Sequence, residues 1–314
     1  MNSKKSGALF LTIIICFIVA EIVIGFTPVG DKLNELALML ISELSFMLPV
    51  VVFFFMSGSS LRECFALNGV KPVVALLSIP YTWMVIPLTA ALNVSTLFFT
   101  ENRATQIFDS LSGAGLFLAA LFAACIAPIC EELTFRGIIF AGFRKSGSAL
   151  QAIILSAVLF GLFHMNFNQA VYAFSLGLFF AALREVTGSI IPSIICHMTL
   201  NGGSVLAIWL EKDLFEDSEM FEKAAEAAVD SKSLAAALGT FIIAAFVGVA
   251  FALCLLAYIA KKQGAVNRLR AILDERISSS GKVSSVPLVI GSILAVIFMI
   301  VVFFLEKMAG RMTA

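Results

Sequence analysis

The sequence predicts an all-α protein, a multi-pass transmembrane helical bundle of about eight to nine spans that forms a single integral membrane domain, residues 1–314. Two observations support this prediction. First, 60% of the residues are hydrophobic, 13% are charged and the mean hydropathy is +1.02, values far from those of soluble domains. Second, apolar runs of about 20 residues recur along the chain, and a helix of that length crosses the hydrocarbon core of a bilayer.

The predicted spans follow these apolar runs in chain order. The first run comes after Lys4 and Lys5 and is longer than the roughly 7 to 15 residues of a signal-peptide core, which favours an uncleaved helix. The third contains Pro80 and Pro87, each of which removes a backbone donor, so this span is expected to be kinked or divided into two short helices. Nine spans are predicted, over residues 7–26, 36–56, 73–99, 112–143, 149–165, 169–183, 189–210, 234–260 and 286–305.

The charges of the loops predict the orientation of the chain in the cell membrane. Cytoplasmic loops carry the excess of Lys and Arg, and placing the N-terminus in the cytoplasm puts most of these loop residues on that side. An odd number of spans then puts the C-terminus outside. Residues 211–233 are acidic and predict a solvated extracytoplasmic helix, whereas residues 261–282 are basic and predict contact with anionic lipids. The net charge of zero gives no indication of a nucleic-acid partner.

A cluster of charged side chains interrupts one of the most apolar stretches. Glu131, Glu132 and Arg136 form the pattern EExxxR within the predicted span 112–143. An ionised side chain near the bilayer centre costs roughly 2.5 to 3.5 kcal/mol, so such groups usually face a protein interior or a wet cavity and indicate function. Glu132 and Arg136 can pair along one helix face, which leaves Glu131 free, and Pro128 is expected to open the helix just upstream. The alternative is a structural ion-pair cluster that locks helices together.

The two histidines of the chain lie in later apolar spans, and each has a partner four residues away. His164 follows Phe160 in the pattern FxxxH, and His197 precedes Asn201 in the pattern HxxxN. A spacing of four puts the imidazole and the amide of the second pair on one helix face, where two donors can converge on one atom. Taken alone, the first pattern is more typical of an interfacial histidine, and the second of an interhelical hydrogen-bond pair.

The three patterns occur in this order on separate predicted helices. At these residues the chain resembles the CAAX-protease and bacteriocin-processing (CPBP) family of intramembrane endopeptidases, which includes the type II CAAX prenyl endopeptidases and Abi proteins. The resemblance covers residues 112–210 and marks them as a catalytic core within the bundle. It implies hydrolysis of peptide bonds, in membrane-associated or lipidated proteins or peptides, inside a polar cavity of the membrane domain.

Peptide hydrolysis requires a base for the attacking water and donors for the developing oxyanion. We expect Glu131, hydrogen-bonded to His164, to activate the water, which agrees with the glutamate-type mechanism of the family. His197 and Asn201 are the expected oxyanion donors. The residues expected to support and orient the site are Glu132 and Arg136.

A zinc site is the main alternative mechanism. Glu131, His164 and His197 supply one carboxylate and two imidazoles, a ligand set that catalytic zinc uses together with water. The sequence has no HExxH pattern, and Asn201 suits an oxyanion donor better than a zinc ligand. Metal-free catalysis without a cofactor is therefore favoured over zinc.

Two other classes of function stay open. A proton-coupled transporter also places glutamate and histidine inside the membrane, although inverted repeats are not apparent in this chain. A non-catalytic bacteriocin-immunity or regulatory membrane protein is the other class, since some relatives in the family that the chain resembles act in bacteriocin self-protection. Glu21 and Glu43, in the first two spans, are either interfacial or structural groups or part of a wet entrance. The expected partners are membrane lipids and a protein or peptide substrate.

Overall fold

A computed structural model describes residues 2–28, 30–100, 116–215, 231–274 and 283–312. Every element of regular structure in these ranges is helical, which confirms the predicted all-α bundle. Seven of the described helices are long and apolar enough to cross a membrane. They are α1 (Ser3–Phe26), α2 (Glu35–Ser57), α4 (Pro72–Leu97), α10 (Phe167–Thr187), α11 (Ile191–Phe215), α13 (Ser231–Gln263) and α15 (Val286–Met312).

Two predicted spans are helical but differ from simple crossings. The predicted span 112–143 is helical from residue 116, and π-helical turns interrupt it twice; its first four residues lie outside the described ranges. The predicted span 149–165 is the shorter helix α9 (Ala149–Phe163), which has 15 residues. The pieces of the interrupted helix are α6 (Leu116–Ala119), the π-helix η2 (Ala120–Ile126), α7 (Ala127–Glu132), the π-helix η3 (Leu133–Ile139) and α8 (Phe140–Ser146). The remaining short elements are η1 (Gly30–Lys32), α3 (Leu61–Phe65) and α14 (Val266–Asp274).

Helix α4 runs without a break through Pro80 and Pro87, so this span does not divide into two helices. Contacts with neighbouring helices hold the proline-containing stretch. The Tyr81 hydroxyl donates to the carbonyl of Phe179 at 3.2 Å, and the Thr82 hydroxyl lies 3.4 Å from the carbonyl of Cys196. Neighbouring helices and hydroxyl side chains commonly stabilise membrane helices that contain proline. The acidic segment expected over residues 211–233 lies mostly outside the described residues.

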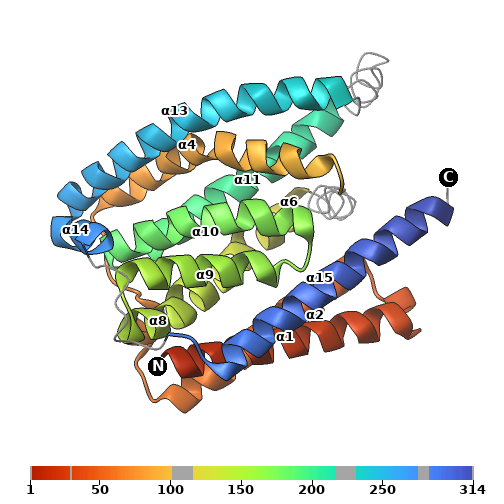
Figure 1. Ribbon diagram of the computed structural model, residues 1–314, viewed down its shortest axis with the longest axis horizontal. Coiled ribbons are helices and arrows are strands. Elements are labelled where there is room, and N and C mark those ends of the chain that lie inside the picture. The colour runs from red at the N-terminus through yellow and green to blue at the C-terminus, as the bar shows by residue number, and fades with distance from the viewer. Residues whose placement is uncertain (1, 29, 101–115, 216–230, 275–282, 313–314) are drawn as a thin grey trace.

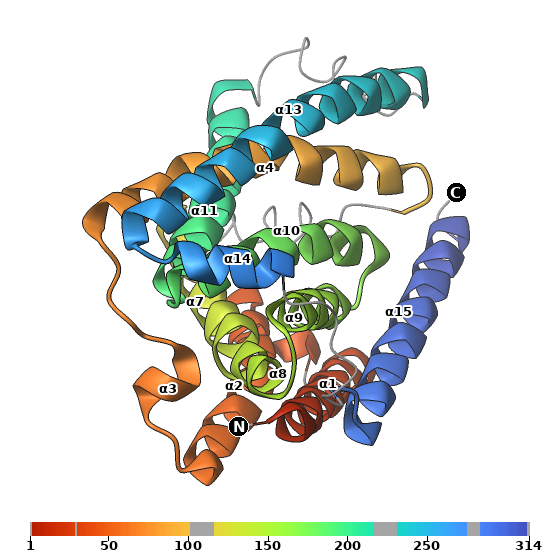
Figure 2. The same cartoon turned by 60° about the vertical axis from the view of Figure 1, so that its left-hand side comes forward.

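The helices pack in three groups (Figures 1 and 2). α1, α2 and α15 lie on one side of the bundle, α4 and α13 lie on the opposite side, and α7 to α11 run between them. The N-terminus, α8 and α14 gather at one end, which we call the N-terminal end of the bundle. Large apolar side chains such as Trp83, Phe246 and Phe304 are exposed on the outer helices, as expected for surfaces in contact with lipid. The protein is therefore a multi-pass membrane protein whose interrupted helix lies near the centre.

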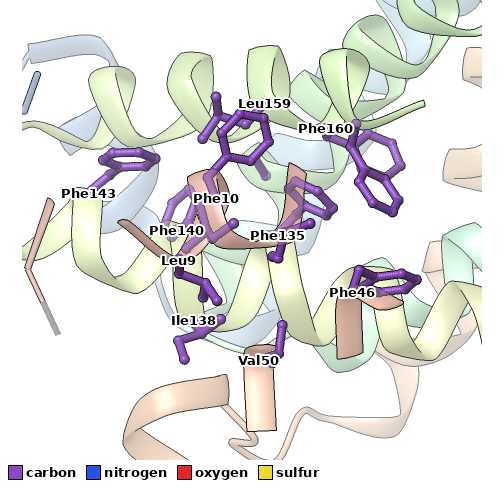
Figure 3. Packing of buried hydrophobic residues seen from close by; sticks show 14 of the residues in the cluster. Leu9, Phe10, Phe46, Val50, Phe135, Ile138, Phe140, Phe143, Leu159 and Phe160 are labelled. Carbon is purple, nitrogen blue, oxygen red and sulfur yellow. The ribbon is translucent and has the colours of Figure 1, made fainter. Parts of the chain in front are cut away.

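An apolar core surrounds the interrupted helix and fixes its position (Figure 3). Aromatic rings from α1, α2, η3, α8 and α9 meet there, and Phe10 of α1 lies among side chains of η3, α8 and α9. Rings of this size bury large apolar areas and prefer edge-to-face contacts, as Phe135 and Phe160 make at a centroid distance of 5.3 Å. The labelled members of this core are Leu9, Phe10, Phe46, Val50, Phe135, Ile138, Phe140, Phe143, Leu159 and Phe160.

The contact between α9 and α10 requires a residue without a side chain. A Cβ atom at Gly177 would lie 2.8 Å from the Cα of Ala157, closer than such atoms approach. We expect Gly177→Ala to lower the free energy of unfolding by about 1 to 3 kcal/mol, because the two helices must separate. Gly239→Ala is the matched control, since nothing lies within 4 Å of a Cβ there. Thermal unfolding of the purified proteins in detergent measures both, and an equal change in the two variants would contradict this account of the helix contact.

Candidate active site

A buried chain of hydrogen bonds joins the interrupted helix to α11. Glu132 ends α7 and Arg136 lies one turn later in η3, and the Arg136 Nη1 donates to the Glu132 Oε1 at 2.9 Å. Both side chains have no exposed surface. The same carboxylate oxygen lies 3.1 Å from the Nδ1 of His197. An ionised carboxylate only accepts, so this imidazole carries its proton on Nδ1. The pairing expected from the spacing of four is therefore present, and it extends to a histidine 65 residues away.

Aromatic rings complete the surroundings of the Arg136 guanidinium. Its central carbon lies 4.0 Å from the ring centroid of Phe160 and 5.5 Å from that of Phe180. Its Nε and Nη2 have no hydrogen-bond acceptor among the described residues, and the ring faces stabilise the cation in their place. The same two rings contact His197, with centroid distances of 5.9 Å and 5.6 Å. Phe160 thus holds both the cation and the imidazole in position.

The second carboxylate of the pair approaches the other side of the His197 ring. The Oε2 of Glu131 lies 3.8 Å from the Nε2 of His197, beyond the length of a direct hydrogen bond. This oxygen is buried and has no hydrogen-bond partner among the described residues. The imidazole therefore lies between the two neighbouring glutamates, one on each ring nitrogen. A polar group of this kind, buried without a partner, is suited to holding a water molecule or a substrate atom.

His164 occupies the end of α9, where its ring caps the helix. The Nδ1 donates to the carbonyl of Phe160 at 2.8 Å, which leaves the Nε2 of the ring without a proton. The backbone N–H of His164 donates to the carbonyl of Gly161 and not to that of Phe160. The imidazole therefore supplies the donor that the Phe160 carbonyl lacks at the end of the helix. The expected pairing of Glu131 with His164 is not among the contacts of the described residues. Instead, His164 and His197 both contact the ring of Phe160, with centroid distances of 4.9 Å and 5.9 Å.

Asn201 is held by a carbonyl group that the π-helix leaves free. Its Nδ2 donates to the carbonyl of Ala123 in η2 at 2.9 Å. In a π-helix each carbonyl bonds the N–H five residues later, and the residue five after Ala123 is Pro128, which has no N–H. The proline upstream of the acidic pair thus opens the helix as expected, and the amide of α11 bonds the freed group. One N–H of the Asn201 amide remains available.

A cavity of about 590 Å³ opens beside the site, between α4, α10 and α11. Asn201 is the predicted site residue that lines it; Glu131, Glu132, Arg136, His164 and His197 are not among its lining residues. The lining is mostly apolar, with a few polar groups. Its members are Trp83, Ile86, Thr89, Ala90, Asn93, Tyr172, Leu176, Thr199, Leu200, Asn201, Gly203, Ser204, Ala207 and Ile208.

The zinc ligands considered from the sequence do not converge. Within the described ranges, no three His, Cys, Asp or Glu side chains are grouped so that they could hold a metal ion. The ring nitrogen of His164 nearest its backbone is bonded to a carbonyl, and Nδ1 of His197 is bonded to Glu132. These bonds leave the Nε2 of each ring open, as they do in many zinc-binding histidines, so they are compatible with the metal-free mechanism and with the zinc alternative.

Two further side chains contribute to the site, of which only Phe180 has no signal in the sequence patterns. Phe180 is one of 30 phenylalanines, and its place beside Arg136 and His197 follows from the packing of α10 alone. Glu43 of α2, for which both a structural role and a wet entrance were considered, contacts the thiol of Cys130 and so approaches the acidic pair. Its buried Oε2 has no hydrogen-bond partner among the described residues.

The Glu132–Arg136 pair yields a prediction about stability. We expect Arg136→Met to lower the free energy of unfolding by about 3 to 5 kcal/mol, because it leaves a buried carboxylate without its countercharge. The double variant Glu132→Gln with Arg136→Met removes both charges and is expected to recover part of that loss. A double-mutant cycle of thermal unfolding in detergent measures the coupling. Additive effects of the two substitutions would show that the pair does not interact as described.

Comparisons with known proteins give a match over the segment that contains these residues. Residues 113–203 match the family described as Rce1-like, type II CAAX prenyl endopeptidase Rce1-like. A curated relative, the "Putative membrane peptidase YdiL" of Bacillus subtilis (strain 168), is 29% identical over 102 residues, which cover 32% of this chain and 41% of the relative. No solved structure matches the chain. The resemblance to the CPBP family of intramembrane proteases, first seen in three short patterns, is thus confirmed over residues 113–203.

Proposed function

We propose that this protein is an intramembrane endopeptidase that hydrolyses peptide bonds of membrane-associated or lipidated proteins or peptides through a water activated by Glu131. One observation carries the proposal: the buried chain from Arg136 through Glu132 to His197 presents an imidazole to Glu131, within the Rce1-like segment. Burying a charged group inside a membrane protein costs free energy. A network in which the Glu131 carboxylate has no direct hydrogen-bond partner is better suited to catalysis than to holding helices together.

The proposed mechanism assigns one task to each group. The unpaired Oε2 of Glu131 accepts a proton from the attacking water. Glu132 accepts from the Nδ1 of His197, as a carboxylate does in a catalytic triad, and so fixes the imidazole with its Nε2 toward the reacting atoms. When this imidazole is protonated, its Nε2 joins the free N–H of Asn201 as an oxyanion donor.

Two further residues take supporting parts in this mechanism. Arg136 orients Glu132 through the 2.9 Å hydrogen bond. The Nε2 of His164 is left open by the Nδ1 hydrogen bond, and in this mechanism it exchanges a proton with Glu131 through water as the substrate binds.

The cavity beside the site supports a peptide substrate that arrives from the membrane. Its volume of about 590 Å³ lies within the range of small-molecule and peptide-side-chain sites, and its lining is mainly apolar. Asn201 lines the cavity and also donates to the carbonyl of Ala123 in the π-helix η2. A bound segment would therefore place its backbone next to the proposed oxyanion donor while its apolar side chains occupy the space between α4 and α10.

We also propose that the N-terminal end of the bundle faces the cytoplasm in the cell membrane. Arginines and lysines of α8, α10 and α14 gather at this end, among them Arg144, Arg184 and Arg268. Cytoplasmic surfaces carry the excess of basic residues in membrane proteins. This orientation is tested by the accessibility of single cysteines, introduced at the exposed Lys5 and Arg270, to a membrane-impermeant reagent.

Substitution of the proposed base tests the activity. We expect Glu131→Gln to abolish peptide cleavage, because an amide cannot accept the proton from water, while the chain still folds. Comparative mass spectrometry of membrane and secreted peptides, from cells that produce wild-type protein or the variant, identifies the cleaved substrates. Glu21→Gln, a carboxylate of α1 outside the Rce1-like segment, is the control and is expected to leave the peptide profile unchanged.

Identical peptide profiles for wild type and Glu131→Gln would contradict the peptidase proposal. They would instead favour a regulatory or immunity protein if partner binding is retained, or a transporter if the variant loses proton flux in vesicles.

Chelation separates the metal-free mechanism from the zinc alternative. We expect the purified protein to keep its peptidase activity in the presence of EDTA and 1,10-phenanthroline, because no three His, Cys, Asp or Glu side chains of the described residues are grouped so that they could hold a metal ion. Activity is measured on a substrate from the peptide profiles, together with the metal content of the same samples. Loss of activity in chelator and its recovery with zinc would overturn the metal-free mechanism.

A further inference from the structure

A second polar cavity, separate from the candidate active site, opens at the N-terminal end of the bundle. It has a volume of about 430 Å³, and its lining residues come from α3, the last turn of α8, the last turn of α10, and α14. Four arginines and two glutamates line it, so its wall has a formal surplus of two positive charges. The charged residues are Arg62, Glu63, Arg144, Arg184, Glu185 and Arg268.

Two of these arginines, Arg144 and Arg184, form ion pairs with Glu185. The Oε1 of Glu185 accepts a hydrogen bond from the Nε of Arg144 at 3.0 Å, and its Oε2 lies 3.7 Å from the Nη1 of Arg184. The Arg184 side chain also donates from Nε to the backbone carbonyl of Arg136, at 3.2 Å, and its guanidinium lies 4.4 Å from the ring centroid of Phe140. Glu185 and Arg184 are largely buried, so this side of the cavity is a fixed part of the fold.

Glu63 is committed to helix capping. Its carboxylate accepts from the backbone N–H of Ser60 at 3.2 Å, and hydrogen bonds from the backbone and hydroxyl of Ser60 hold the pKa of Glu63 below its usual value. The Glu63 carboxylate is therefore ionised, and its Oε2 is already bonded to Ser60.

The other two arginines have only neutral partners among the described residues. The Arg62 Nε donates to the Asn68 Oδ1 at 2.8 Å, and the amide of Asn68 in turn donates to the carbonyl of Gly188 at 2.7 Å. The Arg268 guanidinium packs against Gly188, whose φ of 69° and lack of a side chain allow this close approach. Both guanidinium groups are thus positioned by the backbone around Gly188 and remain uncompensated by a carboxylate.

We propose that this cavity is a binding site for a phosphoryl group. Guanidinium groups bind phosphate through paired N–H donors, and two uncompensated arginines match the one to two negative charges of a phosphoryl group. Basic pockets between membrane helices at the cytoplasmic side are typical sites of lipid headgroups, and a soluble phosphate has the same chemistry. The site requires neither the proposed peptidase activity nor any residue that the mechanism uses directly.

Binding to the purified full-length protein in detergent tests the site. The probes are dioctanoyl-phosphatidylglycerol, inorganic phosphate, and dioctanoylglycerol, which has the same chains without a phosphoryl group. We expect the first or both of the phosphoryl probes to raise the unfolding temperature in a saturable way, and dioctanoylglycerol to leave it unchanged. The variant Arg62→Gln with Arg268→Gln is expected to weaken this binding about tenfold or more, because it removes two charge-assisted contacts.

Arg270→Gln is the matched control, because this exposed arginine lies on the same helix, α14, but does not line the cavity. It is expected to keep the affinity of the wild type. Binding of the lipid alone identifies a headgroup site, and binding of both probes identifies a site for soluble phosphate as well.

Failure of both phosphoryl probes to bind the wild type would overturn the proposal, as would equal binding of dioctanoylglycerol or equal weakening by Arg270→Gln. The single variants Arg62→Gln and Arg268→Gln are measured separately. Each is expected to weaken binding, so the test does not depend on the folding of the double variant.

Discussion

One carboxylate oxygen holds the centre of this bundle together. The Oε1 of Glu132 accepts from Arg136 on its own helix and from His197 on α11, inside a protein whose outer surface is apolar. A guanidinium or carboxylate alone in such a place would be strongly destabilising, but each here has its countercharge or a hydrogen-bond partner. The Oε2 atoms of both glutamates lack a hydrogen-bond partner among the described residues, but Glu132 is bonded to Arg136 and His197 through its Oε1, whereas Glu131 only approaches His197 at 3.8 Å. The asymmetry between two neighbouring glutamates is the basis of the proposed chemistry.

The irregular helix is what makes this arrangement possible. The π-helical turns η2 and η3 flank the acidic pair on both sides, and such turns are frequent at functional sites because they change the direction of side chains and release carbonyl groups. One released carbonyl, that of Ala123, binds Asn201. The carbonyl of Ile139, at the end of η3, also accepts a hydrogen bond from the hydroxyl of Ser6 at 3.2 Å. The helix is therefore irregular but fully supported by the helices around it.

Two polar regions lie within an apolar frame, and Arg184 connects them. At the N-terminal end, Arg184 lines the cavity with the arginine surplus and bonds Glu185. Through its Nε it also holds the carbonyl of Arg136, the residue that orients Glu132. Arg184 therefore has contacts in both polar regions. It links the end of the bundle that faces the aqueous phase to the interior of the bundle.

The sequence alone determined the all-α membrane fold, most of the spans and the identity of the polar side chains near the centre. It could do so because hydrophobic length and helical spacing are local properties, and because the pairing of Glu132 with Arg136 needs only one helix turn. Packing decided the rest. His197, rather than His164, faces Glu131, because α9 ends at His164 and its ring caps the helix. Likewise the unbroken course of α4 and the position of Phe180 depend on neighbouring helices, whose contacts no local pattern of residues specifies.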